Sequence, residues 1–164
     1  MNGTFRALPE AELQGLFADP SRVEQLLYAS FFGGSTNGHD ELEVEKAWHG
    51  LHFLLTGSAW EGSFPLNFIV AGGEEVGDDL GYGPARGLAS SAVQQIDAAL
   101  EPLTSGELRQ RFDPRRMSDL QIYPDGWSDD PDDELDYLLD YYADLRAFVR
   151  RTAERKHALL VYLS

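Results

Sequence analysis

The sequence predicts an α+β fold: a single compact domain over residues 1–164, with a small mixed β-sheet of about four strands and about six helices. The length of 164 residues fits one domain, and no repeat or interior linker divides it. Strand-like and helical segments do not alternate in the regular order of a parallel α/β fold. The final segment, His157–Leu163, is apolar on both faces, which indicates a central strand covered on both sides.

Three further segments have strand character. Thr4–Leu8 alternates weakly, and Arg86–Leu88 is a short extended segment. Leu66–Ala71 carries the strongest strand signal, because it is short, β-branched and aromatic and is followed by Gly72 and Gly73. We therefore expect Leu66–Ala71 to be a strand of the sheet.

The helices are expected from their starts and from their apolar spacing. Pro9 can open the first helix because its missing N–H costs nothing at that position. Thr104 and Glu107 form a capping-box pattern that starts a helix, and Asp113 and Pro114 end that helix. The expected helices cover about residues 9–17, 21–30, 42–55, 90–100, 104–112 and 132–154, and the expected loops include Gly33–Asp40, Ser58–Ser63 and an aromatic-rich Leu120–Trp127.

The helix over 42–55 is expected to be the central packing element. At ~100° per residue, Glu45, His49 and His52 lie together on the edge of its apolar arc, beside Trp48. Gly57 follows and favours a left-handed stop, because glycine has no Cβ to clash. The arc itself comprises Val44, Ala47, Trp48, Leu51, Leu54 and Leu55.

Composition limits the classes of function. The chain has no cysteine, which excludes disulfides, thiolate metal sites and cysteine nucleophiles. Its formal net charge of −15 argues against nucleic acid and favours a cationic protein or ligand, although the charge can also serve solubility alone. The N-terminal residues do not have the apolar run of a signal peptide, and no segment resembles a membrane span, so we expect a cytoplasmic protein.

A family resemblance covers nearly the whole chain. The run Lys46–His49 followed by Leu51–Gly57 resembles the YfbM-like family of bacterial proteins, a domain of unknown function. The same resemblance extends to Gly72-Gly73, to Gly81–Arg86, to Tyr123-Pro124 with Trp127, and to the leucine-rich final strand after a long helix. It implies a compact α+β domain of bacterial origin and implies no activity.

The first candidate site is the edge of the central helix. Glu45, His49 and His52, beside Trp48, could share a face as a two-histidine, one-carboxylate metal site. The spacing misses the zincin motif, and three ligands from one helix need a fourth from elsewhere. We therefore favour the alternative, in which His52 bonds a backbone carbonyl while His49 is solvated, and expect no metal and no cofactor.

The second candidate is the loop with Gly81, Tyr82, Gly83 and Arg86. Its glycines would let backbone N–H groups approach a ligand, and Arg86 offers a planar fork for a carboxylate or phosphate. The alternative is a rigid turn whose Arg86 pairs with an internal carboxylate, for instance from the acidic segment after Tyr123.

Two more features have structural alternatives. Tyr82, Tyr123 and Trp127 could line a pocket, or could cap the core beneath long loops. The acidic run Asp125–Asp136 does not match a calcium loop and is explained by a solvated turn and a helix start.

No catalytic motif supports an enzyme, and catalysis stays open. The primary hypothesis is a non-enzymatic binding domain for a basic protein partner, as in toxin–immunity pairs. The alternative is an enzyme or small-molecule sensor with a pocket between residues 43–55 and the Gly81–Arg86 loop. There Arg86 would anchor an anion and His52 would act as acid–base, which predicts that these two residues converge with Trp48, Tyr82 and Trp127.

Overall fold

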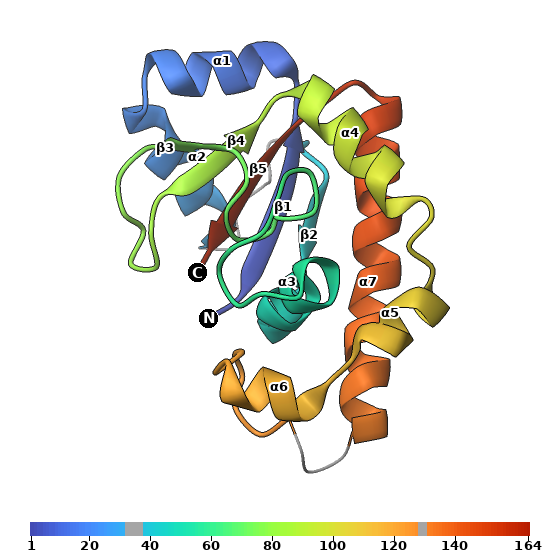
Figure 1. The fold of residues 1–164 in the computed structure, drawn as a ribbon. Helices are drawn as coiled ribbons and strands as arrows, with labels where there is room; N and C mark the ends of the chain where they lie inside the picture. The colour runs from blue at the N-terminus through green and yellow to red at the C-terminus, as the bar shows by residue number, and fades with distance from the viewer. Residues whose placement is uncertain (32–37, 128–130) are drawn as a thin grey trace.

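One antiparallel sheet organises the molecule (Figure 1). The computed structural model describes residues 1–31, 38–127 and 131–164. The sheet has five strands in the order β2-β1-β5-β4-β3, and each neighbouring pair is antiparallel, so the expectation of a mixed sheet was wrong. The strands are β1 (Gly3–Leu8), β2 (Glu41–Glu43), β3 (Glu74–Val76), β4 (Ala85–Leu88) and β5 (Ala158–Leu163).

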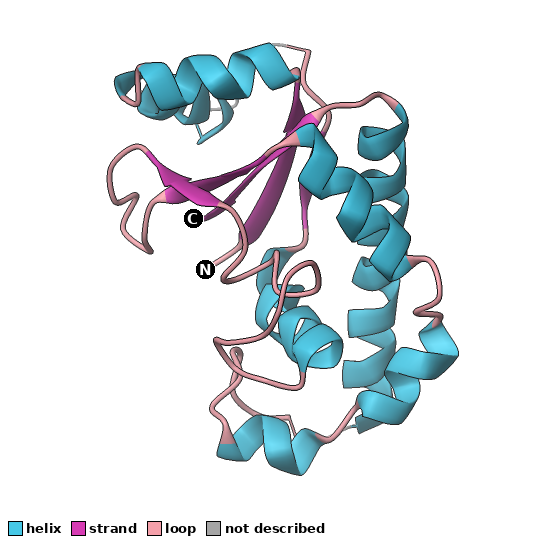
Figure 2. Ribbon diagram, turned by 45° about the horizontal axis from the view of Figure 1, so that its top comes forward, coloured by secondary structure: helices cyan, strands magenta, loops and turns pink. Residues whose placement is uncertain are grey.

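Helices cover both faces of the sheet (Figures 1 and 2). On one face lie α1 (Glu10–Ala18) and α2 (Ser21–Phe31), and on the other lie α3 (Trp48–Thr56), α4 (Ser90–Leu100) and the long α7 (Pro131–Glu154). The short helix α5 (Ser105–Arg111) lies against the lower half of α7, and α6 (Pro114–Asp119) lies below α3 at the bottom of the view in Figure 1. The α+β class is thus confirmed. No helix in the described ranges has both the length and the apolarity to cross a membrane.

The strand β5 has the central place that its sequence predicted. It pairs with β1 on one side and with β4 on the other. Leu160 and Tyr162 enter the core beneath α1 and α2, whereas Leu159 and Val161 enter the larger core beneath α3, α4 and α7. Alternate side chains of a strand point to opposite faces, so a strand with a core on each face must be apolar throughout.

The expected strand Leu66–Ala71 was wrong, because this segment forms successive turns. The carbonyl of Asn67 accepts the backbone N–H groups of Val70, Ala71 and Gly72. Phe68 and Ile69 are nevertheless fully buried. The apolar signal was therefore genuine, but it reported burial in the core rather than pairing in a sheet.

The edge strands β2 and β3 were not expected, because each has only three residues and is rich in glutamate. β2 is held by pairing with β1 and by the buried Arg6, whose Nε donates to Glu41 at 2.7 Å. Most of the expected loop Gly33–Asp40 falls outside the described residues.

The central helix is shorter than expected. Residues Glu41–Glu43 form β2 and Glu45–Ala47 form a 3₁₀ turn, so α3 begins at Trp48. Its central position is confirmed, since every residue from Trp48 to Leu55 is buried, and Gly57 ends it with φ 74°. The break at Asp113-Pro114 is also a helix start: Asp113 accepts the N–H of Arg116 at 3.0 Å and caps α6, which the sequence analysis missed.

Candidate functional site

His49 of α3 is fully buried, so its expected solvation was wrong. Its Nδ1 accepts the backbone N–H of Tyr123 at 2.9 Å, and its Nε2 bonds the carbonyl of Ala59 at 2.7 Å. A nitrogen that accepts an N–H has no proton, so Nε2 carries it and donates to Ala59. Burial lowers the pKa of His49, and the neutral ring therefore connects two loops to the central helix.

His52 has the same role one turn later. Its Nε2 bonds the carbonyl of Glu61 at 2.9 Å, as expected, and its Nδ1 is buried without a hydrogen-bond partner among the described residues. Burial lowers the pKa of His52 to about 4, so the ring is neutral at pH 7. Together, His49 and His52 hold the loop that carries Trp60 against α3.

The proposed metal ligands do not come together. Glu45 lies in the 3₁₀ turn with φ 46°, and its carboxylate forms a hydrogen bond with Tyr141 rather than facing His49. Across the described ranges of the chain, no three His, Asp or Glu side chains are placed to hold a metal ion.

The glycine-containing loop lines a cavity of about 190 Å³, but no residue of 43–55 does, so the cavity does not lie between this loop and the central helix as the alternative hypothesis expected. Tyr82, Gly83 and Arg86 line one part, whereas Gly81 does not. Trp60, from the loop that His49 and His52 hold, lines another. Trp60 and Tyr82 are 57% and 54% exposed, so the cavity has two accessible aromatic rings.

Among the described residues, Arg86 pairs with no internal carboxylate, in contrast to its structural alternative. Its Nη1 donates to the carbonyls of Phe68 (3.2 Å) and Gly72, and its Nη2 donates to that of Ile69 at 2.5 Å. The guanidinium thereby organises the turns at 67–72. Burial lowers the pKa of Arg86 to about 10, so the group remains charged at neutral pH.

The residues that were predicted to converge do not form one group. The buried ring of Trp48 stacks with the buried His49 and with the half-buried Tyr123, and His49 contacts the cavity-lining Trp60 at a centroid distance of 4.4 Å. Trp127 lies apart from them. Its Nε1 donates to the carbonyl of Ile122 at 2.6 Å, and its ring packs against Phe112.

Among the cavity residues that the sequence analysis did not assign to a site are Trp60 and Glu75. Trp60 was assigned to a plain loop, and only its unusual size in such a segment could have singled it out. Glu75 was not considered because β3 was not expected, yet it is the cross-strand partner of Arg86.

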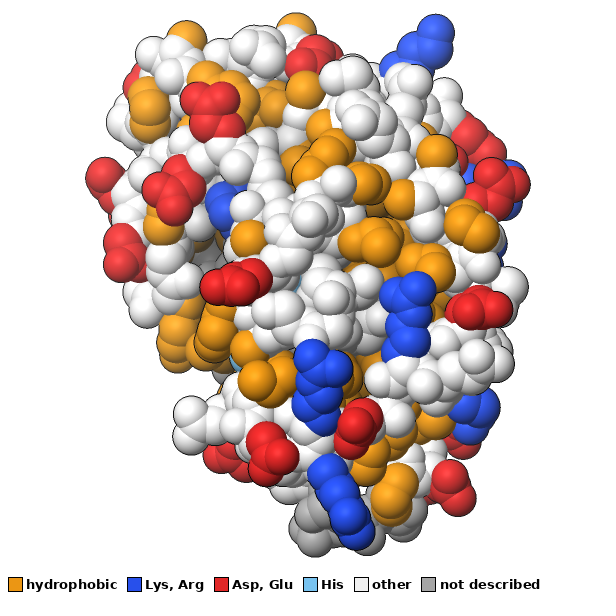
Figure 3. Space-filling model, in the orientation of Figure 1, with side chains coloured by type: hydrophobic (Ala, Val, Ile, Leu, Met, Phe, Trp, Pro, Cys, Tyr) orange, Lys and Arg blue, Asp and Glu red, His pale blue; other side chains and the backbone are white. Residues whose placement is uncertain are grey.

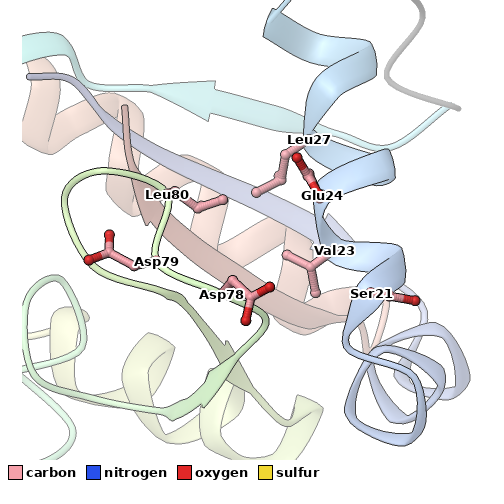
Figure 4. A pocket seen from close by; sticks show the side chains of 7 residues that line it. All are labelled: Ser21, Val23, Glu24, Leu27, Asp78, Asp79 and Leu80. Atoms are coloured by element: carbon pink, nitrogen blue, oxygen red, sulfur yellow. The ribbon is translucent and has the colours of Figure 1, made fainter.

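A second pocket, of about 380 Å³, lies between α2 and the loop that joins β3 to β4. Val23 and Leu27 of α2 face Leu80 of the loop, and Glu24 and Asp78 stand at its sides (Figure 4). Asp79 also lines the pocket but points away from α2, and its Oδ1 accepts the N–H groups of Gly81 (2.7 Å) and Gly83 (2.8 Å).

Charge is unevenly distributed on the face shown in Figure 3. Acidic side chains lie over most of this face, including the region of β3 and the loop after it, whereas lysine and arginine side chains gather mainly in the lower half, near α5 and α6. In that basic region, Arg111 donates to the carbonyls of Leu54 and Leu55, and Arg116 donates to that of Gly57. These arginines neutralise the negative end of α3.

Three comparisons with known proteins agree. A family model described as "Domain of unknown function (DUF1877)" matches residues 1–162. The protein YfbM of Escherichia coli (strain K12) is 31% identical over 165 residues, which span 90% of this chain and 96% of that protein. The crystal structure of a protein of unknown function, YfbM from Escherichia coli, superposes with a TM-score of 0.73 at 23% identity, over 98% of both chains.

Proposed function

The chain belongs to the DUF1877 family, which is defined without an activity, and from that premise we propose that it is a non-enzymatic binding module for a basic protein partner. The contact would be centred on the pocket between α2 and the loop after β3. This pocket combines an apolar floor of Val23, Leu27 and Leu80 with the carboxylates of Glu24 and Asp78. That combination is the observation on which the proposal rests.

The chemistry suits a lysine or arginine side chain. Such a side chain has an apolar stem and a charged end, and both require burial against matching groups. Neither Glu24 nor Asp78 has an ion-pair partner among the described residues, so both carboxylates are available. The acidic region around the pocket would steer a positively charged protein towards it.

The two histidines near the other cavity also support binding rather than acid–base catalysis. The ring nitrogens of His49 are both engaged with backbone groups. His52 has a pKa of about 4 and is fully buried, so almost none of it is protonated at pH 7. A general acid or base works best with a pKa near the operating pH.

Affinity capture from the source organism tests the proposal. Immobilised wild-type chain is compared with a variant carrying Glu24→Gln and Asp78→Asn, and with a control carrying Asp140→Asn and Asp144→Asn on the exposed face of α7. The control removes equal charge away from the pocket. We expect a basic protein to be retained by the wild type and the control, released by added salt, and retained at least tenfold less by the pocket variant.

Two outcomes count against the proposal. One is that no protein is retained above background at low salt. The other is that the pocket variant and the α7 control lose the partner equally, because net charge alone would then explain the retention.

A further inference from the structure

The cavity beside β4 has two charged groups of opposite sign. Arg86 and Glu75 are directly opposed across the β4–β3 pair, and both line the cavity. Directly opposed residues have Cβ atoms only about 5 Å apart and side chains on the same face of the sheet. Yet the two form no ion pair, and Arg86 instead donates to the carbonyls of residues 68, 69 and 72.

Two N–H groups of Arg86 remain unbonded within the described part of the chain. Its Nε–H and one N–H of Nη2 have no acceptor among the described residues. Nε and Nη2 are neighbours on the guanidinium and can together bind both oxygens of one carboxylate. The three backbone carbonyls fix the orientation of the group, so a ligand would not have to immobilise it.

The other walls of the cavity are apolar or aromatic. Ile69 is buried, whereas Trp60 and Tyr82 are each more than half exposed. Exposed rings on two different loops offer a hydrophobic surface that the fold itself does not use. A ligand with an apolar or aromatic body would cover them.

Volume limits the size of this ligand. The cavity has a volume of about 190 Å³. Drug-sized ligands and nucleotides require roughly 300–1,000 Å³. The cavity therefore suits only a small metabolite.

We propose that this cavity binds a free α-amino acid with an apolar or aromatic side chain. Its carboxylate would meet the unbonded donors of Arg86, its ammonium group would meet Glu75, and its side chain would contact Trp60 and Tyr82. A simple anion would lie close to the negative charge of Glu75, and a simple cation would lie close to the positive charge of Arg86, so each would meet one like charge. A zwitterion satisfies both charges at once.

NMR titration tests the proposal with the intact chain. The indole N–H signal of Trp60 is assigned with Trp60→Phe and followed during addition of L-phenylalanine, of 3-phenylpropionate, which lacks the amine, and of phenethylamine, which lacks the carboxylate. We expect L-phenylalanine to shift the signal saturably, and each analogue to bind at least tenfold more weakly.

Glu75→Gln supplies the decisive variant, and Glu74→Gln is its matched control. Glu74 is the adjacent exposed glutamate of β3 and does not line the cavity. Glu75→Gln should weaken the binding of L-phenylalanine at least tenfold and should not weaken that of 3-phenylpropionate, whereas Glu74→Gln should change neither affinity. Neither glutamate lines the pocket at α2, so this result is independent of the protein-binding proposal.

The proposal is overturned if none of the probes shifts the Trp60 signal at millimolar concentration. It is equally overturned if 3-phenylpropionate or phenethylamine binds as tightly as L-phenylalanine, or if Glu75→Gln has no effect on L-phenylalanine. If 3-phenylpropionate or phenethylamine binds as tightly as L-phenylalanine, the cavity is a site for a simple anion or for a simple amine.

Discussion

His49 Nδ1 accepts the backbone N–H of Tyr123 at 2.9 Å, and this bond joins α3 to a segment 74 residues later in the chain. Because the ring can accept only while it is unprotonated at that nitrogen, the bond requires neutral histidine. His52, on the same helix, is also buried and neutral. The centre of the fold is therefore sensitive to acid.

The first prediction concerns pH. The pKa of His52 is about 4 in the folded chain and 6.5 in the reference state, and that of His49 is also lowered. The unfolded chain thus binds more protons between these values, so stability is fully present above pH 6.5 and falls as pH decreases towards 4. We expect His52 to contribute a loss of about 2 kcal/mol between pH 7.5 and pH 5.0, measured by urea unfolding at pH 7.5, 6.0 and 5.0. His52→Gln should lose less of its free energy of unfolding over this pH range. An equal pH dependence of that free energy in both proteins would contradict this account.

The second prediction concerns the contact of β1 with α3. A Cβ added at Gly3 would lie 2.6 Å from Cβ of Trp48, an atom that cannot move without the backbone of the central helix. We expect Gly3→Ala to lower the free energy of unfolding by about 1–3 kcal/mol. Gly106→Ala is the control, because the nearest atom there is 3.6 Å away and alanine favours the helix. Thermal unfolding of both variants measures the difference, and a neutral Gly3→Ala would show that this contact is looser than described.

The third prediction concerns Arg86. Lysine keeps the charge but cannot reach three carbonyls with a planar fork, so Arg86→Lys should cost about 2–4 kcal/mol of stability. Arg150→Lys should change stability by less than about 0.5 kcal/mol, because Arg150 is exposed and its ion pair with Glu154 is 3.8 Å long. Chemical denaturation compares the two, and similar costs would mean that the carbonyl bonds of Arg86 add little.

The fourth prediction concerns the loop after β3. Asp79 bonds the N–H groups of Gly81 and Gly83, whose φ angles are 103° and 94°. Without these bonds, the glycines would regain their conformational freedom. We expect Asp79→Ala to increase hydrogen exchange at residues 77–84 at least tenfold, while exchange in β5 stays unchanged. Unaltered exchange in the loop would show that other contacts fix it.

The sequence predicted those elements whose pattern is local. The both-faced apolarity of β5, the buried stripe of α7 and the stop at Gly57 are each contained within a few turns or a few residues. Pairing at a distance was not predictable in the same way. The glutamates of β2 and β3 have no intrinsic strand signal and become strands only because β1 and β4 lie beside them.

The candidate site was predicted in part for the same reason. Tyr82, Gly83 and Arg86 lie within one short stretch of the sequence, so their pattern was visible there, and all three line a cavity. Trp60 reaches that cavity because His49 and His52 bond the backbone of its loop, and no local pattern encodes such bonds. The pocket at α2 joins residues more than 50 positions apart and left no trace in the sequence analysis.

The hairpin loop after β3 is a wall shared by two chambers: residues 78–80 border one, and residues 82–84 border the other. A molecule that stiffened or displaced this wall from one side would alter the chamber on its opposite side. By thermodynamic reciprocity, each occupant would then change the affinity of the other by the same factor. An occupant of one chamber would in this way influence binding in the other through a few residues of backbone.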